Sequence, residues 1–83
     1  MRRTEIWAVE LLRIADFFQD QPDGTRWESG FVFSGCRITL TELEGHRFAG
    51  MRLPRIQITF EGEEGAVSAI YQRFLLRFLS AGG

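Results

Sequence analysis

The feature that most constrains this chain is a short segment of strict alternation after Arg55. Apolar and polar side chains take turns there, in the order Ile56, Gln57, Ile58, Thr59, Phe60 and Glu61. Successive side chains of a β-strand point to opposite faces, so the segment predicts a strand with one buried and one exposed face. A sheet built on such a strand needs a cover on one side, and the rest of the chain must supply it.

Three more strands are predicted before this one. In the first, Trp27, Ser29, Phe31 and Phe33 share one face; in the second, Cys36, Ile38 and Leu40 point inward while Arg37, Thr39 and Thr41 point outward. A third and weaker strand covers residues 47–52, includes Gly50 and ends at Leu53-Pro54. Glu44-Gly45 predicts the turn that precedes it.

Two amphipathic segments flank the strands and predict helices. In residues 9–18 one side carries Leu11, Leu12, Ala15 and Phe18. After residues 61–65 a stripe is formed by Val67, Ile70, Tyr71, Phe74, Leu75 and Phe78. The start of the first helix has two interpretations. Thr4 could cap a helix from Glu5 to Gln19, which the composition favours, or residues 3–7 could form a short strand.

These elements predict an α+β fold in one domain, residues 1–83. We expect a two-layer sandwich in which two helices cover one face of a four-stranded antiparallel sheet, in the order α-β4-α or β-α-β4-α. With 45% apolar residues among only 83, the chain has material for one small core.

Composition argues against several classes of function. The net charge is −1, and a dedicated nucleic-acid binder usually has a clear basic excess, so we expect no nucleic-acid partner. No apolar run approaches the ~18 residues of a membrane span, and the N-terminal segment carries acidic residues unlike a signal peptide. We therefore predict no membrane association and a cytoplasmic location.

No residue pattern indicates a cofactor, a metal or a catalytic site. The sole cysteine, Cys36, and the sole histidine, His46, are too few for a structural zinc site. They could form a nucleophile pair across two strands, but Cys36 is predicted on the apolar face, where a thiol is usually inert. The terminal Gly82-Gly83 resembles the tail of ubiquitin-like sulfur carriers, although here it follows a helix, where glycine is also a common stop signal.

Two surfaces are candidates for binding. The outward side of the sheet predicts a docking surface for a protein partner or a second copy, formed by Arg37, Thr39, Thr41, Arg55, Gln57 and Thr59. A space between the second helix and the sheet could hold a small apolar ligand, lined by Phe31, Phe33, Phe48, Phe60, Tyr71, Phe74 and Phe78. Four leftover apolar residues, Met51, Leu53, Leu76 and Leu79, suggest a homodimer contact.

The sequence resembles the C-terminal domain of MoaD-related proteins, a domain of unknown function. The resemblance rests on "DGTRWESGFVFSGCRITLTELEG", with its turn at Gly24-Thr25-Arg26, and on "LPRIQITFEGEE", with the strand at Pro54–Glu64. It implies a TBP-like fold of order β-α-β4-α, which favours the strand at residues 3–7. It also implies an association with molybdenum-cofactor or sulfur-transfer proteins. In that family the domain follows an N-terminal ubiquitin-like domain, which we expect this chain to lack.

Three functions follow as hypotheses. The first is a non-enzymatic accessory domain that binds a protein partner or itself. The second is a binder of small apolar ligands, and the third is a sulfur carrier that uses Gly83.

Overall fold

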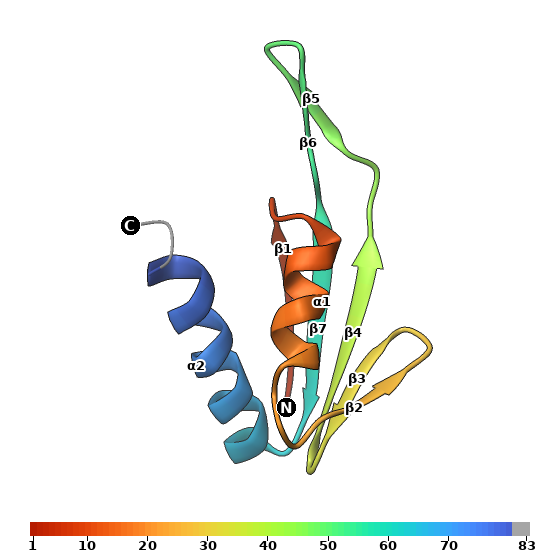
Figure 1. The fold of residues 1–83 in the computed structure, drawn as a ribbon. Coiled ribbons are helices and arrows are strands. Elements are labelled where there is room, and N and C mark those ends of the chain that lie inside the picture. Colours follow the sequence, from red (N-terminus) through yellow and green to blue (C-terminus); the bar gives the residue numbers. More distant parts are fainter. Residues whose placement is uncertain (81–83) are drawn as a thin grey trace.

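The computed structural model describes residues 1–80 (Figure 1). Over that range the strands are β1 (Arg2–Trp7), β2 (Thr25–Trp27), β3 (Gly30–Phe33), β4 (Cys36–Glu42), β5 (His46–Phe48), β6 (Met51–Leu53) and β7 (Ile56–Gly62). The helices are α1 (Leu11–Gln19) and α2 (Glu64–Ser80). The predicted α+β class is therefore confirmed.

The main sheet has five antiparallel strands in the order β1-β7-β4-β3-β2, so the predicted count of four is wrong. The sheet gains β1 and gains one strand because the first predicted strand is split into β2 and β3, and it loses the strand predicted over residues 47–52. The helix that composition favours from Glu5 onward is also wrong. Residues 2–7 pair with residues 56–61 of β7, from Arg2 opposite Glu61 to Trp7 opposite Ile56. Pairing with an open strand edge outweighs the weak local helix preference, as tertiary context commonly does.

The single strand predicted over residues 27–33 is a hairpin instead. Trp27 lies opposite Gly30, and Glu28 and Ser29 form the two-residue turn between β2 and β3. Residues paired across a hairpin point to the same face, so Trp27 points to the same face as Gly30. Phe31, the next residue in the strand, points to the other face of the sheet. The indole N–H of Trp27 donates a hydrogen bond of 3.2 Å to the backbone oxygen of Ile38.

The strand predicted over residues 47–52 is also a hairpin, and it lies outside the main sheet. We call residues 46–53, with strands β5 and β6, the arm; it projects beyond the ends of β4 and β7 (Figure 1). Its turn residues Ala49 and Gly50 have φ values of 52° and 79°, the positive values that a type I′ hairpin turn requires.

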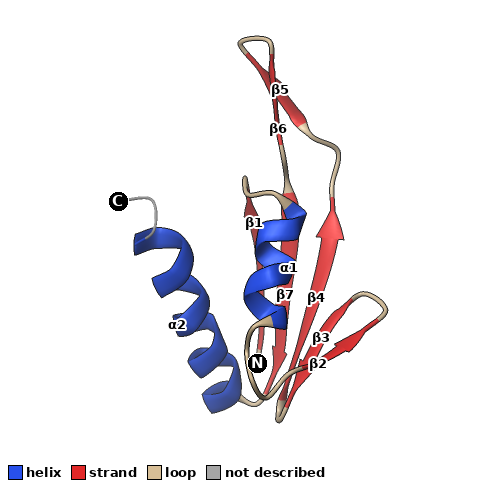
Figure 2. Cartoon of the chain, in the orientation of Figure 1, coloured by secondary structure: helices blue, strands red, loops and turns tan. Residues whose placement is uncertain are grey.

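Both helices lie on one face of the main sheet, as predicted (Figure 2). They enclose a core in which the ring of Phe18 from α1 stacks on that of Phe74 from α2, with centroids 5.7 Å apart. Phe60 of β7 contacts both rings edge-on, at 6.2 Å and 5.9 Å. Ile38, Ile56 and Ile58 complete the floor from the sheet, and all three are fully buried.

Neither described helix has the combination of length and apolar character that crossing a bilayer requires.

Candidate functional site

The candidate site is the sheet face that the helices leave uncovered, which we call the outer sheet face. Three cross-strand rows form it: Ile6 with Gln57 and Thr41; Thr4 with Thr59 and Thr39; and Arg2 with Glu61, Arg37, Val32 and Thr25. Side chains opposite one another on neighbouring strands stand about 5 Å apart, so each row is a continuous strip. The face is mostly hydroxyl, amide and guanidinium groups.

The middle of this face is a ladder of threonines. The side-chain oxygens of Thr4 and Thr59 are 3.3 Å apart, close enough for a hydrogen bond, and Thr39 stands on the other side of Thr59. Thr59 is only 6% exposed although no helix covers it. Its two neighbours shield it, so its hydroxyl is held in place and a partner would meet Thr4 and Thr39 first.

One end of the face is cationic and aromatic. The guanidinium of Arg37 lies over the indole of Trp27, 5.3 Å from the ring centroid. Glu61 stands opposite both Arg2 and Arg37 in the register. A shallow hollow opens here, and its lining includes Arg2, Arg37 and Val32. Such an end offers bidentate donors and a flat ring, which are groups common in protein interfaces.

Five of the six residues predicted for the partner surface lie in strands β4 and β7 on this face, namely Arg37, Thr39, Thr41, Gln57 and Thr59. Arg55 stands apart. It precedes β7 at the base of the arm, where its backbone oxygen accepts a 2.8 Å hydrogen bond from Leu43. There it lines a hollow with Glu10, Glu42 and Arg52.

The seven residues predicted to line an apolar cavity are not gathered around one space. Phe31, Phe33, Phe60 and Phe74 are buried in the core, and Tyr71 and Phe78 pack against its edge. Phe48 is 69% exposed, because it lies on the arm and not in the main sheet. Phe74 lies within 4.8 Å of Phe78 and 5.9 Å of Phe60, measured between ring centroids, so these rings fill the core by contacting each other.

Cys36 and His46 lie too far apart for their side chains to interact. Cys36 begins β4 and His46 follows its far end, so the seven-residue length of the strand, roughly 20 Å, separates them. Burial raises the pKa of the Cys36 thiol, which keeps it protonated at neutral pH. Over residues 1–80, no three His, Cys, Asp or Glu side chains come together as a group that could hold a metal ion.

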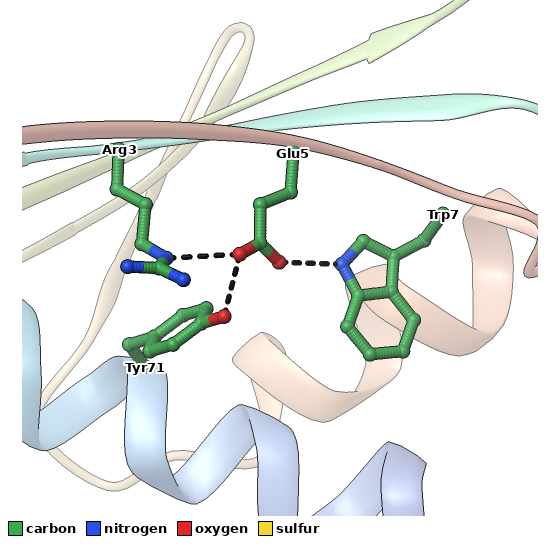
Figure 3. Close-up of polar contacts among 4 residues, drawn as sticks. All are labelled: Arg3, Glu5, Trp7 and Tyr71. Atoms are coloured by element: carbon green, nitrogen blue, oxygen red, sulfur yellow. Dashed lines mark hydrogen bonds and ion pairs between the residues drawn. The ribbon is translucent and has the colours of Figure 1, made fainter.

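A polar cluster on the helix-facing side of β1 was missed by sequence reasoning (Figure 3). The carboxylate of Glu5 accepts hydrogen bonds from Arg3 Nε and Trp7 Nε1, both at 2.9 Å, and from the Tyr71 hydroxyl at 2.5 Å. The guanidinium of Arg3 also lies over the Tyr71 ring, 4.1 Å from its centroid. The cluster thus joins the edge strand to α2.

The environment of this cluster sets its protonation. Burial opposes ionisation of Glu5, but the hydrogen bonds from Tyr71, Trp7 and Arg3 more than offset it, so the Glu5 pKa is lowered. Burial and the hydrogen bond to Glu5 raise the pKa of Tyr71. At neutral pH Glu5 is therefore ionised and accepts the hydrogen bond, and Tyr71 is protonated and donates it. The sequence does contain one signal for this cluster. Arg3, Glu5 and Trp7 stand at alternate positions, which places them on one side of a strand.

The remaining predicted residue, Gly83, lies outside the described residues. The helix α2 extends to Ser80, so a helix and not a strand precedes the Gly82-Gly83 pair.

Comparison with known proteins places the sequence in a family. The family model described as "Archaeal MoaD-like protein" matches residues 16–83. A search of the curated proteins and a search of the solved structures each found no match. The matched range contains the two glycines at the end and every strand after β1.

Proposed function

This chain belongs to the archaeal MoaD-like protein family, and from that premise we propose that it is a non-enzymatic, cytoplasmic accessory domain. Its partner would be a protein of molybdenum-cofactor synthesis or sulfur transfer, bound on the outer sheet face. We also assign it to the TBP-like class, because without the arm its elements run β-α-β4-α.

The observation that carries the proposal is the asymmetry of the sheet. Both helices cover one face, while the outer sheet face presents three rows of hydrogen-bonding side chains. A surface of this kind suits a reversible protein complex, since such interfaces are about as polar as ordinary protein surface and are enriched in arginine and aromatic residues. Arg37 beside Trp27 supplies both at one end.

The experiment is a titration of the isotopically labelled domain with a ubiquitin-like sulfur carrier of the MoaD type, followed by NMR. We expect the amide signals of Arg37, Thr39 and Gln57 to shift while those of α2 stay in place. The variant Arg37→Glu should weaken binding about ten-fold or more, as loss of an interface arginine commonly does.

The control is Arg73→Glu, which makes the same charge change on α2. Arg73 has an exposed ion pair with Asp23 at 3.6 Å, so its replacement should have little effect on the fold. Equal loss of binding in both variants, or shifts confined to the helices, would contradict the assigned surface.

One observation favours a second function. The family match continues through Gly82 and Gly83, so a sulfur-carrier role for Gly83 deserves its own test. The measurement is the intact mass of untagged protein from its native host. A mass gain equal to one oxygen replaced by one sulfur, localised to Gly83, would establish the carrier, whereas an unmodified mass under sulfur-replete growth would remove it.

A further inference from the structure

The arm has one apolar and one cationic face. Phe48 lies directly opposite Met51, and Leu53 opposite His46, so these four side chains share a face. Arg47 and Arg52 are opposite one another on the other face. All six strand residues of the arm are exposed to solvent. The body of the same chain therefore leaves the apolar face of the arm uncovered.

An arm of this kind gains little stability by itself. An isolated two-stranded hairpin is marginally stable in water. The turn adds a cost of roughly 1–2 kcal/mol, because Ala49 takes a left-handed conformation that strains an L-residue with a side chain. Exposed apolar side chains grouped on a projecting element commonly mark a contact with another molecule.

The distribution of charge indicates which kind of molecule contacts the arm. The arm contains Arg47 and Arg52 and no acidic residue, so it carries +2, while the whole chain carries −1. The rest of the chain therefore carries −3. Opposite charges of this size attract the arm of one copy to the body of another and disfavour contact between two bodies.

The body offers a matching receptor. A groove between α1 and the β2–β3 hairpin has a volume of about 170 Å³, and its apolar lining consists of Leu11, Leu12, Ala15, Phe31 and Leu40. An apolar cavity on the order of 150 Å³ accommodates a benzene ring. The groove is thus of a size for the side chain of Phe48.

The polar rim of the groove is compatible with a cationic arm. Glu28 and Arg26 both line it, together with Ser29. The guanidinium of Arg26 lies 5.6 Å from the centroid of the Phe31 ring, so the groove's own aromatic already provides it with a contact. Leu12 is 76% exposed. Covering it would bury apolar surface on both molecules.

We propose that two copies of this chain form a closed dimer in which the arm of each inserts Phe48 into the groove of the other. Reciprocal exchange uses the same two surfaces on both copies, so the contact closes with two-fold symmetry and leaves no free arm. Arg47 and Arg52 remain in water on the far face of the arm. This inference is independent of the proposed function, because the arm and the groove share none of the residues predicted for the partner surface.

The first test locates Met51 in the dimer. Photo-methionine, which is close to methionine in size, replaces Met51 in the full chain, and labelled and unlabelled copies are mixed before irradiation. We expect cross-links between copies, from Met51 to residues 11–15 or 26–31. Cross-links from Met51 to α2 or to the outer sheet face of the second copy, or none at all, would overturn the proposal. Peptide mapping separates these products from those of Met1.

The second test measures dimerisation by sedimentation over a range of protein concentrations. Phe48→Ser and Leu12→Arg, on the two sides of the contact, should each weaken the dimer about ten-fold or more. The matched control is Leu79→Ser, an exposed leucine on α2 that the contact does not use, and it should leave the dimer unchanged.

Three results would refute the dimer. The wild-type chain could be monomeric at every concentration, or Leu79→Ser could weaken the dimer as much as Phe48→Ser does. The third is binding of single-stranded RNA or of anionic phospholipid vesicles by a monomer, lost in Phe48→Ser, which would assign the arm a different occupant.

Discussion

The strands β4 and β7 and the arm are two halves of one long hairpin, and they differ in what surrounds them. In the inner half, Cys36 to Glu42 pairs with Ile56 to Gly62, with β1 and β3 on either side and helices above. In the outer half, β5 and β6 have only each other. Phe60 is fully buried in the first half and Phe48 is 69% exposed in the second. Neighbouring elements, not the strand itself, decide whether an apolar side chain becomes core.

A slip of register marks the boundary between the halves. Leu43 still bonds to Arg55 in the register of β4 and β7, but His46 pairs with Leu53, so Glu44 and Gly45 stand opposite Pro54 alone. Two residues against one form a bulge, which bends a strand and increases its twist. Pro54 has no N–H to continue the ladder. The arm therefore leaves the sheet where the chain itself interrupts the pairing.

The largest effect should come from the buried half. Phe60→Ala removes a ring that contacts Phe18, Tyr71 and Phe74, and leaves a cavity. We expect the free energy of unfolding to fall by about 3–5 kcal/mol, measured by urea denaturation. A loss below about 1 kcal/mol would mean that the core tolerates the cavity and that the buried half of the hairpin contributes no more stability than the arm.

An intermediate effect is expected at the edge of the sheet. Glu5→Gln removes a charged acceptor of three hydrogen bonds, so the free energy of unfolding should fall by about 1–2 kcal/mol. Tyr71→Phe removes one of these bonds without changing the charge and should have the smaller effect. If Tyr71→Phe cost more than Glu5→Gln, the ring packing and not the carboxylate would hold β1 to α2.

The same cluster predicts a dependence of stability on pH. The pKa of Glu5 is lower in the folded state, so the unfolded chain binds more protons as pH falls. Its contribution is complete above the unfolded pKa of about 4.3 and is lost as pH falls through the folded pKa. Comparison of wild type with Glu5→Gln between neutral and acid pH tests this. Parallel stability curves for the two proteins would contradict it.

The smallest effect should come from the arm. Phe48→Ala makes the same truncation as Phe60→Ala in the outer half of the hairpin. At a dilution where the chain is monomeric, we expect the free energy of unfolding to change by no more than about 0.5 kcal/mol. A loss that approaches that of Phe60→Ala would show that the arm folds back on its own body in solution.

Local pattern predicted several parts of the molecule well. The alternation from Ile56 to Glu61 is a central strand with its apolar side inward, and Thr39 and Thr41 are on the opposite side with Gln57. The second helix buries Val67, Ile70 and Phe74 as its stripe indicated. These predictions succeeded because the period of the side chains is a property of the strand or helix itself.

The errors fell where pairing partners decided the outcome. Residues 27–33 alternate correctly for one strand, but the two-residue turn at Glu28 and Ser29 placed Trp27 on the outer sheet face beside Arg37. The Glu5 cluster needs Tyr71, which lies 66 residues away in the chain. A single sequence carries no direct signal for contacts at that separation.

The sequence by itself determined the class of fold, the central strand, the apolar face of the second helix and the polar character of the outer sheet face. Each follows from the spacing of side chains along a short segment. The predicted face of the first helix is wrong in part, because the helix buries Ile14, Phe17 and Phe18 and leaves Leu12 exposed. Only the tertiary structure decided that residues 2–7 form the edge of the sheet, that Phe48 stands apart from the other aromatic residues, and that Leu12 borders an open groove. These depend on which segments meet in space, because an edge strand, a core ring and a groove are each defined by their neighbours.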